Sequence, residues 1–319
     1  MRKSVSILGT PFELEGDAYY LGVMGDRFEP DTVALMALLC EEDAQVLDVG
    51  ANIGLTALAL SRIARRGRVA AVEPVPEAFS FLVRNLARAQ VDNVKPYNFA
   101  LGPHDGTVVM QGSPDFLAGS FVTTDYPVDI PGHFRKTVPM RALDSCFAEL
   151  DLSRLDFVKL DVEGYELDVL EGSRRTLARF RPLVMLELNH WCLNVFRGIP
   201  LRAFVARLRE LLPVAYAVDG PDFLDLYDER HFHHLAHEHV VNGRYKTVVA
   251  GYEAASILKR LVWLGRWQHV LRERELALAE RQQALAERDR LASAQAAILA
   301  SWSWRLTRPL RALRRLLGR

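Results

Sequence analysis

The sequence lacks long apolar runs, and it contains few cysteines. Its longest apolar run, residues 33–40, is eight residues long, whereas a membrane-spanning helix needs about 18. Near the N-terminus, Pro11 interrupts the apolar residues before a signal-peptide core could form. The three cysteines are far apart, which excludes a disulfide framework and a CxxC zinc site: Cys40, Cys146 and Cys192. We therefore expect a cytoplasmic protein, at most peripheral to the inner face of the cell membrane.

The chain also lacks a net charge, but the charges are unevenly distributed. Residues 256–319 hold 14 Lys/Arg and five Asp/Glu, a balance of +9, while the first 255 residues balance at −9. Such a body is not expected to bind nucleic acid by charge alone, whereas a basic tail suits an anionic surface.

Strand and helix patterns alternate through most of the chain. Short apolar runs that predict seven strands cover residues 45–50, 68–73, 93–99, 155–161, 181–188, 214–218 and 247–252. Helical spacing fills most of the gaps, which predicts an α/β fold with a mostly parallel sheet and helices on both faces. Residues 102–143 are rich in Pro and Gly and predict a hairpin and a loop. Residues 1–44 would form an N-terminal cap, and the domain would run over 45–255.

A different composition follows the predicted domain. Residues 256–300 contain the heptad-spaced repeat Ala-Leu-Ala-Glu-Arg, typical of a long helix that forms a coiled coil; a lone charged surface helix is the alternative. Residues 301–319 carry six arginines, two tryptophans and no acid. This composition favours an amphipathic helix on an anionic membrane, or one that docks on a partner helix.

A glycine-rich turn lies where the first predicted strand meets a helix. Residues 48–54 read Asp-Val-Gly-Ala-Asn-Ile-Gly, in which Gly50 and Gly54 let the backbone bend and admit a ligand near the free N–H groups of the helix. Asn52 stands where a dinucleotide fingerprint needs its second glycine, which disfavours a nicotinamide dehydrogenase. At the end of the second strand, Glu73 is placed to accept hydrogen bonds from both hydroxyls of a ribose.

Several motifs together resemble the FkbM-type methyltransferase family. They are Phe28-Glu-Pro, the turn at 48–54, Val72-Glu-Pro, the Asn98-Phe-Ala-Leu-Gly run, the Lys-Leu-Asp-Val-Glu-Gly block at 159–164 and the run from Arg181 to Glu187. The resemblance covers residues 27–251. It implies a class I, Rossmann-like fold, S-adenosylmethionine as cofactor, and O-methylation of a sugar or another hydroxyl-bearing metabolite. It places Glu29, Asp48, Gly50, Asn52, Gly54, Glu73, Asn98 and Asp161 at the cofactor. The closing residues 301–311 resemble a terminal motif of bacterial surface-polysaccharide enzymes.

The catalytic candidates follow the fourth and fifth strands. Lys159 and Asp161 are two residues apart on one strand and face the same side, so Asp161 is expected near the methyl donor. Glu163 either caps the next helix or acts in the site. A sugar hydroxyl is a poor nucleophile, so a general base is expected; His190 and Asp161 are the contenders.

Five histidines gather within residues 231–239. His233 and His237 are four residues apart and could share a metal ion if they lie on a helix, although a loop near the acceptor pocket is the preferred interpretation and no metal is predicted.

The leading hypothesis is therefore an S-adenosylmethionine-dependent O-methyltransferase acting on a sugar hydroxyl of a cell-surface polysaccharide or its precursor. The alternatives are methylation of a small secondary metabolite or lipid, and a non-catalytic scaffold in a glycan-assembly complex. The expected partners are a glycan acceptor and, through the coiled coil, a second chain, which is either another copy of this protein or a different one.

Overall fold

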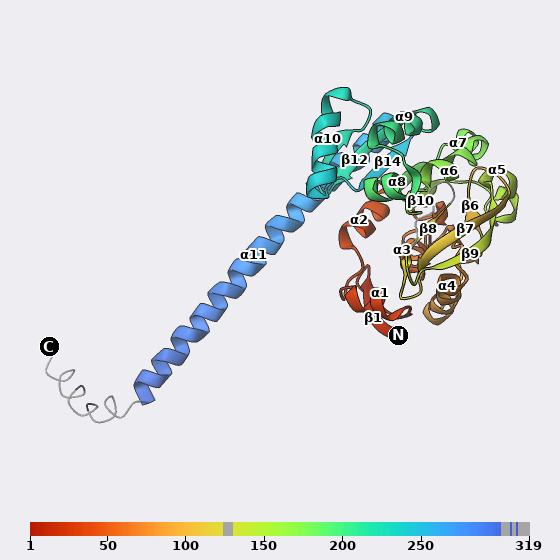
Figure 1. Ribbon diagram of the computed structural model, residues 1–319. Helices are drawn as coiled ribbons and strands as arrows, with labels where there is room; N and C mark the ends of the chain where they lie inside the picture. The colour runs from red at the N-terminus through yellow and green to blue at the C-terminus, as the bar shows by residue number, and fades with distance from the viewer. Residues whose placement is uncertain (124–129, 301–306, 308–310, 312–319) are drawn as a thin grey trace. The chain divides into compact units, whose positions relative to one another are not determined.

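The computed structural model describes residues 1–123, 130–300, 307 and 311. The chain divides into two compact units, Met1–Gly265 and Arg266–Arg319. The first unit holds the sheets and nearly all of the helices (Figure 1). No helix in the described ranges is long and apolar enough to cross a membrane.

An eight-stranded mixed sheet forms the centre of the first unit. Its strand order is β13-β12-β14-β11-β10-β3-β4-β5. The strands are β3 (Gln45–Val49), β4 (Arg68–Val72), β5 (Val94–Tyr97), β10 (Phe157–Leu160), β11 (Leu183–Glu187), β12 (Val214–Asp219), β13 (Asp222–Asp225) and β14 (Thr247–Gly251). Strands β11, β10, β3, β4 and β5 are parallel neighbours, while β14 runs antiparallel to both β11 and β12.

The prediction of seven mostly parallel strands is correct for the five strands β11, β10, β3, β4 and β5, which are parallel. It is wrong in the number of strands. The eighth strand, β13, returns on β12 through a tight turn whose Gly220 has a φ of 58°. Residues Asp222–Asp225 read Asp-Phe-Leu-Asp, which is only four residues long and shows no alternation of polar and apolar side chains, so the sequence pattern does not predict a strand there.

Helices cover both faces of this sheet. They are α1 (Ala18–Val23), α2 (Pro30–Leu39), α3 (Leu55–Ile63), α4 (Pro76–Ala89), α5 (Leu143–Cys146), α6 (Glu166–Glu171), α7 (Arg174–Phe180), α8 (His190–Arg197), α9 (Leu201–Leu211) and α10 (Glu229–Asn242). Alternate residues of one strand enter different cores: Val158 and Leu160 pack with α6, α7 and α9, whereas Phe157 packs with α2 and α3.

Smaller sheets accompany the central one. An N-terminal hairpin, β1 (Arg2–Ile7) and β2 (Thr10–Glu15), packs on α3 and α4. Residues 102–143, predicted to form a hairpin and a loop, form most of a four-stranded sheet of order β6-β9-β7-β8. Its strands are β6 (Ala100–Leu101), β7 (Gly106–Ser113), β8 (Phe116–Val122) and β9 (Phe134–Arg141).

The long helix α11 (Ala254–Ala300) begins inside the first unit. Ile257, Leu261 and Leu264 of its first turns are buried in the core that contains α2 and α3. Beyond the unit, Leu285 and Leu291 are exposed. The helix is thus confirmed, while the coiled coil stays a prediction, and nearly all of the predicted tail 301–319 lies outside the described residues.

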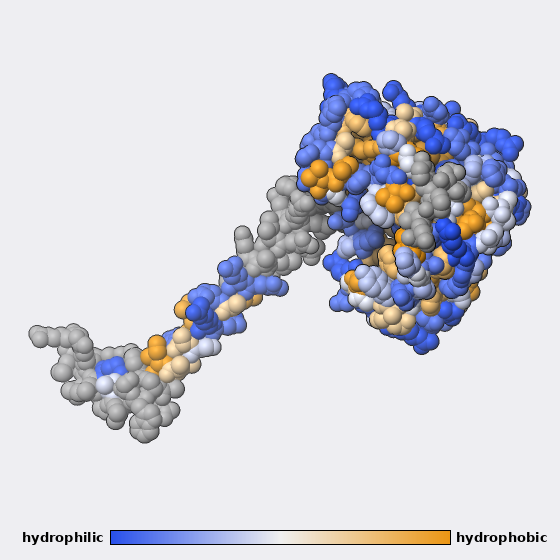
Figure 2. All heavy atoms as spheres, viewed as in Figure 1, coloured by the Kyte–Doolittle hydropathy of each residue, from blue (hydrophilic) through white to orange (hydrophobic). Residues whose placement is uncertain are grey.

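The surface of the first unit is mainly hydrophilic on the face drawn in Figure 2, with small separate hydrophobic areas.

The histidine-rich residues 231–239, predicted to form a loop, lie on α10, because Asp228 caps that helix by accepting from the N–H of Arg230. One of these histidines, His239, is buried.

Candidate active site

The glycine turn after β3 is packed tightly against the end of β10. Gly50 has a φ of 80°, and a Cβ atom there would lie 1.9 Å from the backbone oxygen of Asp161. The N–H groups of Gly50 and Ala51 donate to the carbonyl of Val72 at 3.0 and 3.1 Å, which joins the turn to β4. A side chain at position 50 would therefore separate the two strand ends.

Glu73 connects the glycine turn to the residues after β4. Its two carboxylate oxygens accept from the backbone N–H groups of Asn52 at 2.9 Å and Val75 at 2.8 Å. Burial raises the pKa of Glu73 to about 7. The side-chain amide of Asn98 donates to the carbonyls of Glu73 and Pro74, so Asn98 fixes this segment and does not line the cavities described below.

Asp48 and Gly54 support the turn from below. Asp48 is fully buried, accepts from the Thr56 hydroxyl at 2.8 Å, and has a pKa raised by burial. Gly54 has a φ of 100° and precedes the first residue of α3, with Leu82 too close for a Cβ atom. Neither residue lines a cavity, so the structure gives both a supporting position.

Two adjoining hollows open at the carboxyl ends of β3 and β10. The larger is a cavity of about 410 Å³, and the smaller, beside Glu73, is lined mainly by apolar side chains. Gly50, Asn52, Asp161 and Glu163 line both. This is the position where ligands bind in open α/β sheets.

Lys159 and Asp161 form an ion pair at the floor of the larger cavity. The Lys159 Nζ lies 3.0 Å from an Asp161 oxygen, and the lysine side chain is 8% exposed against 40% for the aspartate. The neighbouring carboxylates of Asp161 and Asp48 hold the pKa of Lys159 above its usual range despite the opposing effect of burial. The ammonium group is therefore charged and fixes the orientation of Asp161.

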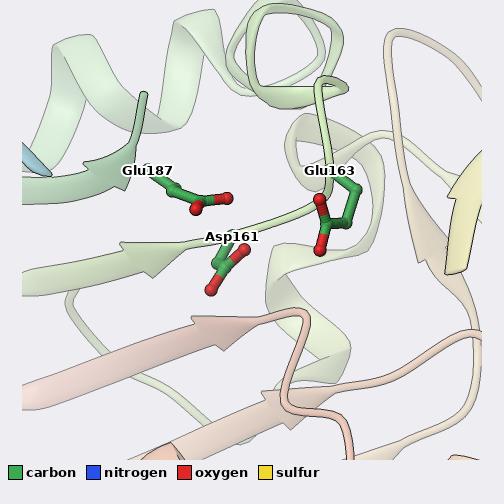
Figure 3. Close-up of side chains that lie close together, drawn as sticks. All are labelled: Asp161, Glu163 and Glu187. Atoms are coloured by element: carbon green, nitrogen blue, oxygen red, sulfur yellow. The ribbon is translucent and has the colours of Figure 1, made fainter. Parts of the chain in front are cut away.

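Three carboxylates converge on this cavity. Asp161 and Glu163 follow β10, and Glu187 ends β11; Figure 3 shows their carboxyl groups turned toward a common space. One oxygen from each lies within 4.8 Å of the others. Burial, reinforced by its acidic neighbours, raises the pKa of Glu187 to about 9. Because like charges this close cannot all ionise, the cluster holds a proton at neutral pH.

The oxygens of these carboxylates lie close enough together to hold a metal ion, but two of the three side chains already have partners in the protein. Asp161 is already paired with Lys159, and Glu163 accepts from protein donors. In the part of the chain that the structure describes, no histidine of α10 belongs to a group of three possible ligands.

Glu163 does not cap the helix that follows it. It has a φ of 52°, and α6 begins after Tyr165 without a side-chain cap. Glu166 instead accepts from the N–H groups of Val162 and Gly164, both at 3.2 Å. The capping alternative for Glu163 is therefore wrong, and its side chain is left to face the cavity.

The structure brings some predicted residues into the cavity and leaves His190 outside its lining. Glu29, at the start of α2, lines the larger hollow with the residues described above. His190 is the first residue of α8, and its ring packs edge-on against the buried His239 at 4.9 Å. Sequence reasoning missed Tyr20, Thr32 and Lys246, which line the cavity from segments with no recognisable motif.

A mixed sheet with five parallel neighbouring strands, a glycine turn after β3 and an acid after β4 are the features of a nucleoside-binding, Rossmann-like α/β protein. Residues 48–213 match the Methyltransferase FkbM domain, which is about half of the chain. The chain belongs to the FkbM methyltransferase family, and its domain is an S-adenosylmethionine-dependent methyltransferase domain.

Of two curated relatives, one is named for its substrate and the other for the position that it methylates. The chain is 33% identical over 164 residues to hexuronic acid methyltransferase AglP of Haloferax volcanii, covering 51% of this chain and 63% of that protein. It is 24% identical over 197 residues to 2-O-methyltransferase NoeI of Sinorhizobium fredii, covering 56% and 75%. The matched part spans about three fifths of the length of the first curated relatives.

A solved structure of a methyltransferase FkbM from Methylobacillus flagellatus is also similar to this chain. It has 17% sequence identity and a TM-score of 0.41, with 66% of this chain and 44% of that chain covered.

The residues around the two hollows fit S-adenosylmethionine. The side-chain oxygen of Asn52 is buried and has no hydrogen-bond partner among the described residues, so a ligand donor beside the turn would satisfy it. The smaller, apolar hollow beside Glu73 suits a nucleoside base. The acids around the larger one (Glu29, Asp161, Glu163 and Glu187) favour a ligand that carries positive charge.

Proposed function

We propose that this protein is an S-adenosylmethionine-dependent O-methyltransferase that methylates a hydroxyl of a sugar in a cell-surface polysaccharide or its precursor. The observation that carries the proposal is the carboxylate-lined cavity of about 410 Å³ next to the glycine turn. One relative supports a sugar acceptor by its name, hexuronic acid methyltransferase, and another supports transfer to an oxygen, 2-O-methyltransferase.

In this proposal the turn and the strand ends hold the methyl donor. The turn at Gly50, the side-chain oxygen of Asn52 and the carboxylate of Glu73 would bind the nucleoside end. Glu29 and Asp161 would face the positively charged end. S-adenosylmethionine, when bound, supplies a methyl group on a sulfonium that a hydroxyl oxygen can attack. Lys159 acts as a positioning residue, because its ammonium holds Asp161 at 3.0 Å.

The larger setting is part of the same proposal. Helix α11 would pair chains or bind a partner as a coiled coil, and the basic residues beyond it would bring the enzyme to an anionic membrane surface on the cytoplasmic side. A glycan acceptor carried on a lipid would be reached most easily from such a position.

Methyl transfer to defined sugars tests the function. The full chain is incubated with S-adenosylmethionine carrying a labelled methyl group and with oligosaccharides that contain either uronic acids or neutral sugars. We expect label in the sugar as an ether, which survives alkali, because the proposed acceptor is a hydroxyl. Label that alkali removes would indicate an ester on a carboxyl group and contradict the proposal.

Asp161→Asn is the matched inactive variant. It keeps the size of the side chain but removes the charge that faces Lys159 and the methyl donor, so kcat should fall by about 10² to 10³. Full activity of Asp161→Asn would reject the proposed site. If the chain binds S-adenosylmethionine but transfers no methyl group to any sugar, the proposed acceptor is rejected.

A further inference from the structure

Glu163 lies where the two hollows meet. It lines both the apolar hollow beside Glu73 and the larger cavity below the glycine turn. If the first takes the nucleoside and the second the rest of the methyl donor, the reacting methyl lies near this junction. The acceptor hydroxyl must approach the same point.

The fold orients the Glu163 carboxylate in a specific way. Its Oε2 accepts from the Cys192 thiol at 3.0 Å and from the Asn189 side-chain amide at 3.4 Å. Both donors come from the beginning of α8, where Cys192 is 2% exposed. Among the described residues no donor bonds to Oε1, so one oxygen is held by the protein and the other faces the cavity.

The backbone also indicates a function for this residue. Glu163 is held at a φ of 52°, a left-handed conformation that is strained for a residue with a side chain. Neither helix capping nor an ion pair explains why a glutamate occupies this position, since Glu166 caps the turn and Lys159 pairs with Asp161.

We propose that Glu163 is the general base that removes the proton of the acceptor hydroxyl. This assignment rests on the proposed function. The acceptor oxygen forms the new C–O bond as the C–S bond of the methyl donor breaks, and that electron pair stays on sulfur. The hydroxyl proton passes to Oε1 of Glu163, so the charges balance without a further reactant.

The charges around Glu163 suit this role. The titratable groups that face it are Lys159, Asp161, Glu166, Glu187 and the Cys192 thiol. Burial raises the pKa of Glu163 to about 7, with Asp161 adding to the rise and the Cys192 hydrogen bond opposing it. A base is most effective when its pKa lies near the working pH.

The other candidates are less well placed to accept a proton. Asp161 is neutralised by Lys159 at 3.0 Å. Glu187, with a pKa of about 9, already carries a proton at neutral pH. His190 packs against His239 and does not line either hollow.

Glu163→Gln provides the first test, because it preserves the shape and removes the base. We expect kcat to fall by about 10² to 10⁴ and the remaining rate to lose its dependence on pH below about 7. Calorimetry should show a far smaller change in the Kd of S-adenosylmethionine than in kcat, because Glu29 and Asp161 still face its positively charged end. An unchanged kcat and an unchanged pH profile would overturn the proposal while leaving the methyltransferase function intact.

Cys192→Ala tests the same role through a different atom. Loss of the thiol hydrogen bond removes a contact that lowers the pKa of Glu163, so the acidic limb of the pH–rate profile should move to higher pH. In the cofactor-free protein, carbon-13 NMR of the glutamate carboxyl groups should show the same shift. Cys40→Ala, a buried cysteine on a different core, is the matched control and should leave both readings in place.

Two further outcomes would overturn the assignment. If a chelator abolishes turnover and Mg²⁺ restores it, the three carboxylates bind a cation and Glu163 is not the general base. A wild-type chain that methylates no hydroxyl would reject the proposed function, and the base role with it, because no proton would then need removal.

Discussion

The two pairs of strand ends that meet at the cavity present different chemistry. After β3 and β4 the cavity is lined by the glycine turn, with the buried side-chain oxygen of Asn52 and the single carboxylate of Glu73. After β10 and β11 it is lined by three carboxylates whose oxygens lie within 4.8 Å of one another. The first pair is joined by hydrogen bonds that leave little freedom, while the second holds groups that can gain or lose a proton.

This difference separates binding from reaction. The glycine turn and the buried Glu73 suit a constant ligand such as a nucleoside, whereas Glu163 and Glu187 face one another, have raised pKa values and suit proton transfer. Substitutions at the β3 and β4 ends should therefore change stability or cofactor affinity, and those at the β10 and β11 ends should change kcat.

The largest expected effect is on stability, from Gly50→Ala. The new Cβ atom would lie 1.9 Å from the Asp161 backbone oxygen, at a φ of 80°, so the variant should lose more than about 3 kcal/mol of unfolding free energy. Gly9→Ala is the matched control, because Gly9 has a φ of 75° and no atom within 4 Å of its Cβ position.

Gly9→Ala should cost only about 1–2 kcal/mol, the strain of the left-handed backbone alone. Denaturant unfolding followed by circular dichroism measures both variants. Equal losses would mean that the contact between the turn and β10 does not hold the two sides of the cavity together.

An intermediate effect is expected from Glu73→Gln on cofactor affinity. Loss of the charged acceptor should weaken S-adenosylmethionine binding by about 1.5–3 kcal/mol, with a smaller change in kcat. Titration calorimetry measures this, and Glu77→Gln, which removes an acid paired with Lys136 on the surface, serves as control. A fall in kcat at unchanged affinity would erase the distinction between the two strand pairs.

The same substitution has a predictable pH dependence. The pKa of Glu73 is raised from 4.5 to about 7 on folding, so its contribution to stability is full below about pH 4.5 and is lost as the pH rises through 7. Glu73→Gln lacks this loss, and its stability relative to wild type should improve over that range. A constant difference from pH 4 to 8 would contradict the raised pKa.

The smallest effect is expected from His190→Ala. Because the His190 ring packs on His239 and does not line the cavity, kcat should stay within about twofold and the acidic limb of the pH–rate profile should persist. Loss of that limb would make His190 the base, as one sequence hypothesis holds, and would move the reacting group from β10 to α8.

Local patterns were sufficient to predict the centre of the sheet and the glycine turn that follows β3. The apolar runs that end at Gly50, Glu73 and Asp161 are strands, and the family match begins at Asp48. These features are encoded within a few consecutive residues, because strand alternation and glycine turns depend on local backbone geometry. The extra strand β13 pairs locally with β12 but is too short to show a pattern. The sheet formed by β6–β9 depends on the pairing of β9 with the more distant β6 and β7, which local patterns do not specify.

The sequence by itself determined the fold class, the family and the acids available for chemistry. Only the tertiary structure decided which acids meet: it joined Glu187 to Asp161 and Glu163, and it turned Cys192 toward Glu163 from 29 residues away. In the tertiary structure His190 packs against His239 and does not line the cavity. Glu166, and not Glu163, accepts from the backbone N–H groups that precede α6. The physical reason is that a pKa, a hydrogen bond and a cavity wall depend on neighbours in space, and the sequence order of those neighbours leaves their distances open.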